Sequence, residues 1–374
     1  SAMRSLEKKV TAFDPDMPIA RAWTPPSSWY TDDDIHALEL THVFGRSWQP
    51  VARTAELPER GSYVAGCFAS EPWVVVRGAD DVLRAFFNTC RHKGREVVTG
   101  RGCAAELVCG YHAWRYDLDG RLRSAPRIGG IEEFDRGAMS LLPLGLEQWG
   151  PWVFVHRERT PTGLKNQLPE LDAALERSGW SSLKFAGEQS WTIACNWKVY
   201  VDNYLDGGYH VPHMHPTLDA QLEMDAYRTD IYERSSIQSC PPASESDPRV
   251  RYDARQRIGE RALYAWIYPN FMINRYGPCL DTNHVVPLGP DRCRVDYQFY
   301  FADVQGEAAQ RFVADSMAQS DVTQREDIAI CESVQRGLAS ESYDRGRYAP
   351  TVETGEHHFH RLLAADYRRA LARK

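Results

Sequence analysis

Two short segments decide the fold of this chain: Cys90-Arg91-His92 and, after sixteen intervening residues, Cys109-Gly110-Tyr111-His112. Each segment offers one thiolate and one imidazole, so together they form a four-ligand set in two matching arms. A structural zinc ion also takes two Cys and two His, but zinc fingers usually place both cysteines in one arm and both histidines in the other. The mixed arms therefore favour a centre with two chemically different metal ions.

That ligand set is the one of a Rieske [2Fe-2S] cluster, in which one iron takes both cysteine sulfurs and the other takes both histidine nitrogens. The neutral imidazoles raise the reduction potential to roughly −150 to +300 mV, so the cluster accepts electrons easily and passes them on. We therefore predict that Cys90, His92, Cys109 and His112 bind the cluster. A disulfide between Cys90 and Cys109 is the remaining alternative.

The composition indicates a globular enzyme. A length of 374 residues predicts two or three domains, and 43% hydrophobic residues are enough for sizeable cores. Nine cysteines without framework spacing predict a reducing compartment, so we expect the protein to be cytoplasmic. No run approaches the roughly 18 apolar residues of a membrane span. A net charge of −7 without a block of Lys or Arg argues against a nucleic-acid partner.

The sequence divides around the cluster motif. In residues 47–156, short apolar runs alternate with Gly, Pro and Asp turns, which predicts a small antiparallel β domain that holds the cluster. Residues 1–46 form an N-terminal helical segment packing on the second domain, with a helix from about residue 30 to about residue 47 that Thr31 caps. Residues 157–374 mix strands and helices in that second domain. The predicted fold class is α+β.

The second domain carries its own candidate metal site, because His210, His213 and His215 fall within six residues. A non-haem Fe(II) oxygenase needs two His and one carboxylate on one face of an octahedron. On a regular helix His210 and His213 lie about 60° apart, whereas His210 and His215 lie about 140° apart. Pro212 and Gly207-Gly208 disturb a regular helix, so a distorted segment could bring His215 round. The residues alone leave the pair open, and ordinary polar histidines are the alternative.

The whole pattern resembles the α-subunit of Rieske non-haem iron oxygenases over nearly the full chain. The resemblance implies that the second domain is a catalytic domain of the helix-grip type, an antiparallel sheet with helices, which holds a mononuclear Fe(II). Its implied ligands are His210 and His215, spaced as His-x4-His, and Asp327 on a late helix. Glu326 is the nearest rival of Asp327. Without the resemblance Asp327 does not stand out, since fifty-one acidic residues compete for the role.

In this family a carboxylate connects a cluster histidine of one subunit with an iron ligand of the next. Gly207 stands three residues before His210, where the family usually has this acid. The resemblance therefore points to Asp206, with Asp202 on the preceding turn as the alternative, and Asn203 is a further catalytic candidate. An Asp before two glycines is also a common turn residue.

Within the family, residues 202–212 and residues 268–278 with Asp281-Thr282-Asn283 are most similar to choline monooxygenase and to bacterial glycine betaine and related quaternary-ammonium oxygenases. A permanent cation without an N–H is best held by aromatic faces. Five aromatic residues are available for such a cage: Tyr204, Tyr264, Trp266, Phe271 and Tyr276. For each of them, packing in the core of a strand is the alternative.

The resemblance implies a terminal oxygenase component that uses O2 to hydroxylate or N-demethylate a small quaternary-ammonium substrate such as choline or glycine betaine. Electrons from NAD(P)H would arrive through a separate flavin/ferredoxin-type reductase, because the chain shows no nucleotide-binding fingerprint and no plant-type ferredoxin cysteines. The family also implies a homotrimer. Three alternatives are an aromatic-ring or aromatic-acid hydroxylating oxygenase, a cluster-only electron-transfer protein and a zinc-stabilised binding module.

Overall fold

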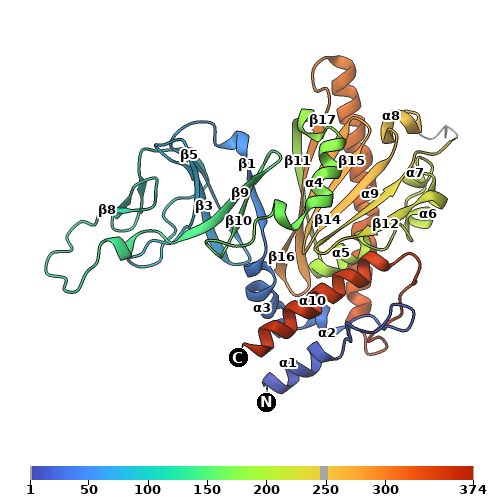
Figure 1. Cartoon of the computed structure of the whole chain (residues 1–374), viewed down its shortest axis with the longest axis horizontal. Coiled ribbons are helices and arrows are strands. Elements are labelled where there is room, and N and C mark those ends of the chain that lie inside the picture. The colour runs from blue at the N-terminus through green and yellow to red at the C-terminus, as the bar shows by residue number, and fades with distance from the viewer. Residues whose placement is uncertain (1, 245–251, 374) are drawn as a thin grey trace. The chain divides into compact units, whose positions relative to one another are not determined.

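The computed structural model describes residues 2–244 and 252–373 (Figure 1). The chain divides into two compact units, Phe44–Asn166 and Ser1–Val43 together with Gln167–Lys374. Residues 44–46 and 157–166, which lie outside the predicted range 47–156, belong to the unit that holds the cluster motif. Within the described ranges, no helix combines the length and apolar character needed to cross a bilayer.

The unit Phe44–Asn166 contains a seven-stranded antiparallel sheet in the order β1-β10-β9-β4-β3-β2-β5 and a three-stranded sheet in the order β6-β7-β8. The valine run in β3 is fully buried, as expected of β-branched residues in a sheet core. The strands are β1 Gln49–Arg53, β2 Ser62–Phe68, β3 Glu71–Arg77, β4 Leu83–Phe87, β5 Arg101–Cys103, β6 Leu107–Val108, β7 Arg115–Tyr116, β8 Leu122–Ser124, β9 Pro143–Trp149 and β10 Trp152–His156. Short 3-10 turns are η1 Phe44–Arg46, η2 Thr54–Glu56, η3 Gly137–Met139 and η4 Lys165–Gln167.

The larger unit is built on a second seven-stranded antiparallel sheet, in the order β11-β17-β16-β15-β14-β13-β12. Strands β12 to β17 follow one another in both sequence and space, and β11 closes the far edge by pairing with β17. The strands are β11 Lys184–Ile193, β12 Arg228–Ile231, β13 Ser235–Cys240, β14 Ala262–Ile267, β15 Phe271–Tyr276, β16 Cys279–Gly289 and β17 Arg292–Phe301. The prediction of an α+β fold with antiparallel sheets is confirmed.

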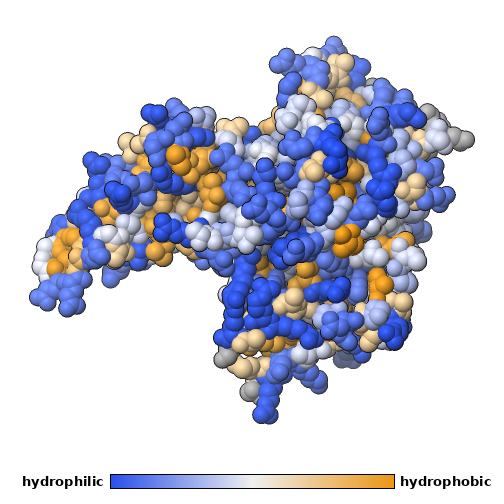
Figure 2. All heavy atoms as spheres, in the orientation of Figure 1, coloured by the Kyte–Doolittle hydropathy of each residue, from blue (hydrophilic) through white to orange (hydrophobic). Residues whose placement is uncertain are grey.

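Helices surround this sheet (Figure 1). Helix α5 contacts β16 and β17 of the sheet as well as the long α9, and α9 also contacts β11 directly. Helix α10 contacts β12 and α3. The helices are α1 Ala2–Thr11, α2 Ser28–Thr31, α3 Asp33–His42, α4 Pro169–Arg177, α5 Trp197–Tyr204, α6 Val211–Met214, α7 Pro216–Asp219, α8 Ala254–Ile258, α9 Glu307–Leu338 and α10 Thr354–Ala372, with turns η5 Trp180–Ser182 and η6 Met224–Ala226. On the face that Figure 2 shows, hydrophilic side chains predominate and apolar ones form small separate groups.

The predicted N-terminal helix is shorter than expected, and Thr31 does not cap it. Thr31 is the last residue of α2, and its hydroxyl donates to Ser27 O at 3.1 Å. A tertiary contact holds α3: the fully buried Glu39 pairs with Lys198 of α5, with 2.7 Å between Oε2 and Nζ. Removing either partner would leave an uncompensated buried charge, so this pair ties the N-terminal segment to α5.

Candidate metal centres and substrate cavity

The two loops that carry the predicted cluster ligands have the same backbone hydrogen bonds. The Cys90 N–H donates to Arg95 O at 2.8 Å, and the Gly94 N–H donates back to Cys90 O at 2.9 Å. Cys109 makes the same two bonds with the residues five and four positions later, at 2.9 and 3.1 Å. The backbone around the two cysteines is thus equivalent, although His92 stands two residues after its cysteine and His112 three residues after its own.

Both loops also need a left-handed residue at the same place. Gly94 has φ +84° and Ala113 has φ +59°, and each stands four residues after its cysteine. Glycine adopts this conformation freely, whereas a residue with a Cβ atom loses about 1–2 kcal/mol. The second loop therefore stores strain that the first loop avoids.

The ligand side chains fit the predicted cluster. The sulfur-bearing Cys90 and Cys109 are buried, whereas His92 is partly exposed and His112 is exposed. The two histidine Nδ1 atoms lie 3.0 Å apart, so both nitrogens converge on one point where a single iron could take them. All nine cysteines are free thiols, which does not favour the disulfide alternative. The Tyr116 hydroxyl lies 3.3 Å from Cys90 Sγ and can donate to that sulfur.

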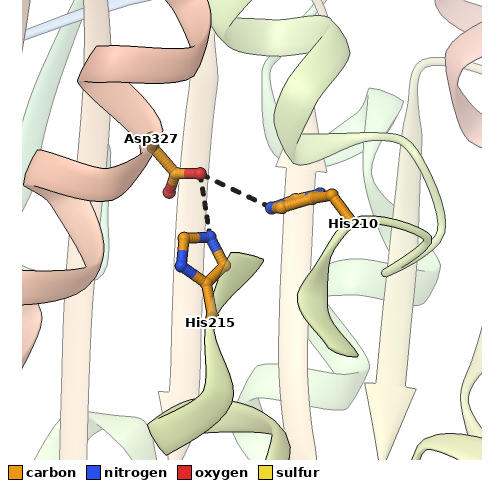
Figure 3. Close-up of side chains that lie close together, drawn as sticks. All are labelled: His210, His215 and Asp327. Atoms are coloured by element: carbon orange, nitrogen blue, oxygen red, sulfur yellow. Dashed lines mark hydrogen bonds and ion pairs between the residues drawn. The ribbon is translucent and has the colours of Figure 1, made fainter. Parts of the chain in front are cut away.

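His210, His215 and Asp327 lie together in the larger unit, with both imidazole rings directed at the carboxylate (Figure 3). The Asp327 Oδ1 atom lies 2.9 Å from His215 Nε2 and 3.5 Å from His210 Nε2. One possible ligand atom from each residue lies within 4.8 Å of the others. His213 is exposed on α6, between the other two histidines. The arrangement has the donor set of a two-His, one-carboxylate iron site.

A second carboxylate lies beside each of these histidines. Asp206 Oδ2 is 2.6 Å from His210 Nδ1, and Glu326 Oε1 is 3.3 Å from His215 Nδ1. An Nδ1–H donated to a carboxylate leaves Nε2 available for a metal ion. Burial lowers the pKa of His210, but hydrogen bonds to Asp206 and Asp327 outweigh it and raise the pKa to about 10. Without a metal this site therefore holds protons, and a cation such as Fe(II) would replace them.

Asp202 and Asp206 stand one helical turn apart but have different partners. Asp202 Oδ1 lies 2.7 Å from His360 Nε2, and its Oδ2 accepts from the Tyr30 hydroxyl at 2.6 Å. Asp206 uses Oδ2 for His210, while its buried Oδ1 has no hydrogen-bond partner in the described part of the chain. Only Asp206 therefore keeps an acceptor for a further group.

The two glycines after Asp206 let it reach His210. Gly207 and Gly208 have φ values of +71° and +76°, which favour glycine. A Cβ atom on Gly207 would also collide with the carbonyl of Val352. Asp206 stands four residues before His210, one more than the spacing that the resemblance implies. The left-handed turn at Gly207 and Gly208 accommodates this additional residue.

A cavity of about 170 Å³ adjoins the three candidate iron ligands. Asn203 and the acids Asp206, Asp281 and Asp327 contribute to its wall, and Arg257 is the one Lys or Arg among the described lining residues. Its most frequent lining residue is tyrosine, at Tyr200, Tyr204, Tyr227, Tyr264, Tyr276 and Tyr297. Three of the five predicted cage residues, Tyr204, Tyr264 and Tyr276, are among them.

Trp266 and Phe271, the other two predicted cage residues, are placed in the core. Trp266 follows Tyr264 along β14, where its ring packs edge-on against Phe359 of α10 at 5.5 Å between centroids. Phe271 is buried beside His284, on the face of β15 opposite to Asn274 and Tyr276, since side chains alternate along a strand. Both residues therefore fit the alternative given above, packing in the core of a strand.

Several cavity residues were missed by the sequence reasoning. Tyr200 stands four residues before Tyr204, so helical spacing on α5 would have placed both on one face. Tyr227 and Arg257 gave no such signal, because they come from a turn and from a short helix whose place depends on the tertiary fold. Asp281 was noted only as part of a similar stretch.

Asp281 is a buried acid whose two oxygens are both engaged. Its Oδ1 accepts from Asn274 Nδ2 at 2.6 Å and its Oδ2 accepts from the Tyr276 hydroxyl at 2.7 Å. Burial raises the pKa of Asp281 to about 6, although these hydrogen bonds favour the carboxylate. The acid is thus charged at neutral pH and lies in a wall of tyrosine rings.

Comparison with known proteins relates both candidate metal centres to described protein families. Residues 47–135 match the family described as Rieske [2Fe-2S] domain, and residues 173–368 match the ring hydroxylating alpha subunit (catalytic domain). Chloroplastic choline monooxygenase of Arabidopsis thaliana is 43% identical over 374 residues, covering 97% of this chain and 87% of that protein. The carnitine monooxygenase oxygenase subunit of Escherichia coli K12 is 32% identical and covers 92% of this chain and 93% of its own. A crystal structure of a quaternary ammonium Rieske monooxygenase with L-carnitine has a TM-score of 0.78 at 29% identity, over 96% of this chain and 98% of that chain.

Proposed function

Because the chain belongs to the Rieske ring-hydroxylating oxygenase α-subunits, we propose that it is the terminal oxygenase for a small quaternary-ammonium substrate. Proteins of this family carry a [2Fe-2S] cluster and a mononuclear iron centre. They work with O2 and with electrons that a separate reductase takes from NAD(P)H. The substrate class is the part of the proposal that rests on this chain's own cavity.

The observation that carries the proposal is the tyrosine-rich cavity beside His210, His215 and Asp327. Aromatic faces attract a permanent cation by about 2 kcal/mol or more when the cation is desolvated. Hydrogen bonds keep several hydroxyls occupied: Tyr204 donates to Asn274 Oδ1 at 2.6 Å and Tyr227 donates to Gln238 Oε1 at 2.8 Å. The rings are thereby held in place, with Asp281 as an anionic group among them.

The proposed reaction inserts one oxygen atom of O2 into a C–H bond next to nitrogen or oxygen, and two electrons and two protons reduce the other atom to water. When bound, the cluster supplies electrons and the mononuclear iron activates O2. On choline the product is betaine aldehyde hydrate. On an N-methyl betaine the product is a hemiaminal, which collapses to formaldehyde and the demethylated amine.

We assign the site residues within this proposal as follows. Cys90, His92, Cys109 and His112 hold the cluster, and His210, His215 and Asp327 hold the mononuclear iron. Asp206 is the carboxylate that connects the two centres across subunits of a homotrimer, supported by its buried Oδ1 without a partner. Asp202, whose oxygens are both taken within the chain, has a structural role. A cytoplasmic location belongs to the same proposal, supported by nine free thiols.

A single turnover tests the reaction class without a reductase. The protein is reduced chemically, mixed with air and one candidate substrate, and the products are identified by mass spectrometry. We expect a hydroxylated or demethylated product from choline, glycine betaine or carnitine, with formaldehyde where a methyl group is lost. Product from a benzoate alone would replace the proposal by an aromatic-acid oxygenase, and iron-free, colourless protein would support the zinc module.

A further inference from the structure

Arg257 is a buried cation that forms no close ion pair with any acid of residues 2–244 and 252–373. Its side chain belongs to α8 and leaves the residue only 6% exposed. Nη1 donates to the Ser316 hydroxyl at 3.0 Å, the guanidinium carbon lies 5.7 Å from the centre of the Phe312 ring, and Nε has no hydrogen-bond partner. Among the described residues, the neutral hydroxyl of Ser316 is the hydrogen-bond acceptor of the Arg257 side chain.

Two other arginines in this unit are more fully satisfied. Arg275 donates to the carbonyls of Gly277, Cys279 and Ser178, and Arg261 donates to those of Ala226 and Ser239. Lys198, which is fully buried, pairs with Glu39. The half-buried Arg261 and Arg275 and the buried Lys198 each meet two or more oxygen atoms, although the Nε atoms of both arginines, like that of Arg257, have no partner among the described residues.

A guanidinium keeps its charge in a protein, so burial cannot be relieved by loss of a proton. An unpaired charge removed from water is strongly unfavourable, and buried charges are ordinarily paired. A capping box on α8 nevertheless fixes the turn that carries Arg257, because Asp253 accepts from the Gln256 N–H and Gln256 reaches back to Asp253. The fold therefore maintains a preorganised cation for which the described part of the chain supplies no ion-paired carboxylate.

The position of Arg257 identifies where that anion would come from. Arg257 lines the same cavity as the candidate iron ligands. Its contact Ser316 and the candidate ligand Asp327 both lie on α9, eleven residues apart, which corresponds to about 16 Å along the helix axis. Arg257 and the metal ligands thus belong to different parts of the cavity wall, with tyrosine residues and Asp281 among the other lining residues.

We propose that Arg257 binds the carboxylate of a betaine, so that the preferred substrate is a zwitterion with a carboxylate and an N-methylated ammonium group rather than choline. This inference rests on the proposed function and narrows it. Arg257 is a specificity-determining residue: it holds the carboxylate end, while the tyrosine wall takes the ammonium end. The C–H bond that breaks then belongs to an N-methyl group. O2, two electrons and two protons give the hemiaminal and water, and the hemiaminal releases formaldehyde and the dimethylamino acid.

Matched ligand pairs isolate the carboxylate. Glycine betaine and choline share the trimethylammonium group and differ in a carboxylate against a CH2OH group, and γ-butyrobetaine and its methyl ester form a longer pair. Dissociation constants are measured by calorimetry without O2, so that binding is separated from turnover. The carboxylate member of at least one pair should bind wild-type protein about 30-fold or more tighter, the range expected for a buried charged hydrogen bond.

The variants are Arg257→Gln, which removes the charge, Arg257→Lys, which retains it, and Arg261→Gln as a control in a neighbouring arginine outside the cavity. We expect Arg257→Gln to lose the preference for the carboxylate member while its choline affinity changes less than about threefold. Arg257→Lys should keep part of the preference, and Arg261→Gln should keep all of it. The visible spectrum of the cluster confirms that each variant is folded.

The possible results distinguish failure of the role proposed for Arg257 from failure of the proposed oxygenase function. Equal binding of both pair members by wild-type protein, or an equal loss of both in Arg257→Gln, overturns the role of Arg257 while single turnover of a quaternary amine still supports the oxygenase. Failure of wild-type protein to oxidise every quaternary amine overturns the proposed function, and the inference falls with it.

Discussion

The two candidate metal centres are built in opposite ways. The cluster ligands come from two loops of one small unit, each closed by its own backbone hydrogen bonds. The iron ligands come from distant segments, since His215 and Asp327 are 112 residues apart in sequence and meet only because α9 packs against α5. A centre made of local loops depends on turn chemistry, whereas a convergent centre depends on the packing of a whole domain.

The largest expected effect separates the two centres. His215→Ala should abolish turnover and remove about one iron per chain while the visible spectrum of the cluster persists, because the convergent site loses a ligand and the loops are untouched. Cys109→Ala should remove the visible absorbance of the cluster and leave the mononuclear iron bound. Iron content and absorbance of the same preparations check this. A His215→Ala protein with full iron and normal turnover would refute the assignment.

The next effect concerns the two acids on and after α5. Asp206→Asn should slow substrate-dependent reoxidation of the reduced cluster about 10- to 100-fold while cluster and iron remain, as expected for a group that orients a metal ligand. Asp202→Asn should lower the free energy of unfolding by about 1–3 kcal/mol, since His360 and Tyr30 lose a buried partner, but leave reoxidation near the wild-type rate. Stopped-flow absorbance measures both, and the opposite pattern would exchange their roles.

A smaller effect follows from the acid in the cavity. The pKa of Asp281 is raised to about 6, so this group is neutral below that pH and negative above it. Choline is a permanent cation whose charge does not change in this range. Its affinity should therefore rise on the order of tenfold between about pH 5 and about pH 7. Asp281→Asn should flatten the profile measured by calorimetry, and an unchanged profile would show that another group controls it.

The smallest effect tests the equivalence of the cluster loops. Ala113→Gly should stabilise the protein by about 1 kcal/mol, and Gly94→Ala should destabilise it by a similar amount, because both positions require a positive φ. Thermal unfolding followed by cluster absorbance compares the two variants. Equal shifts in the same direction would mean that the loops are not equivalent.

Particular residues show how far the sequence could be interpreted. Alternating apolar runs and turn residues identified the antiparallel β unit, and the same reasoning gave an N-terminal helix that is too long and wrongly capped by Thr31. Two of five aromatic candidates, Trp266 and Phe271, lie in the core, because aromatic residues have the same strand preference whether they face a cavity or other side chains. A pattern of residue types therefore predicts elements better than it predicts which face is open.

The sequence by itself determined the ligands proposed for the cluster, because each arm is a short loop whose chemistry is complete within a few residues. It also indicated a metal site among the three close histidines. Only the tertiary structure placed His210, His215 and Asp327 together. Among the described residues it also left Asp206 with an unpaired oxygen, unlike Asp202, and left the buried Arg257 without an ion pair. These properties depend on which side chains meet across long sequence separations and on what is excluded from water, and neither is encoded in local spacing.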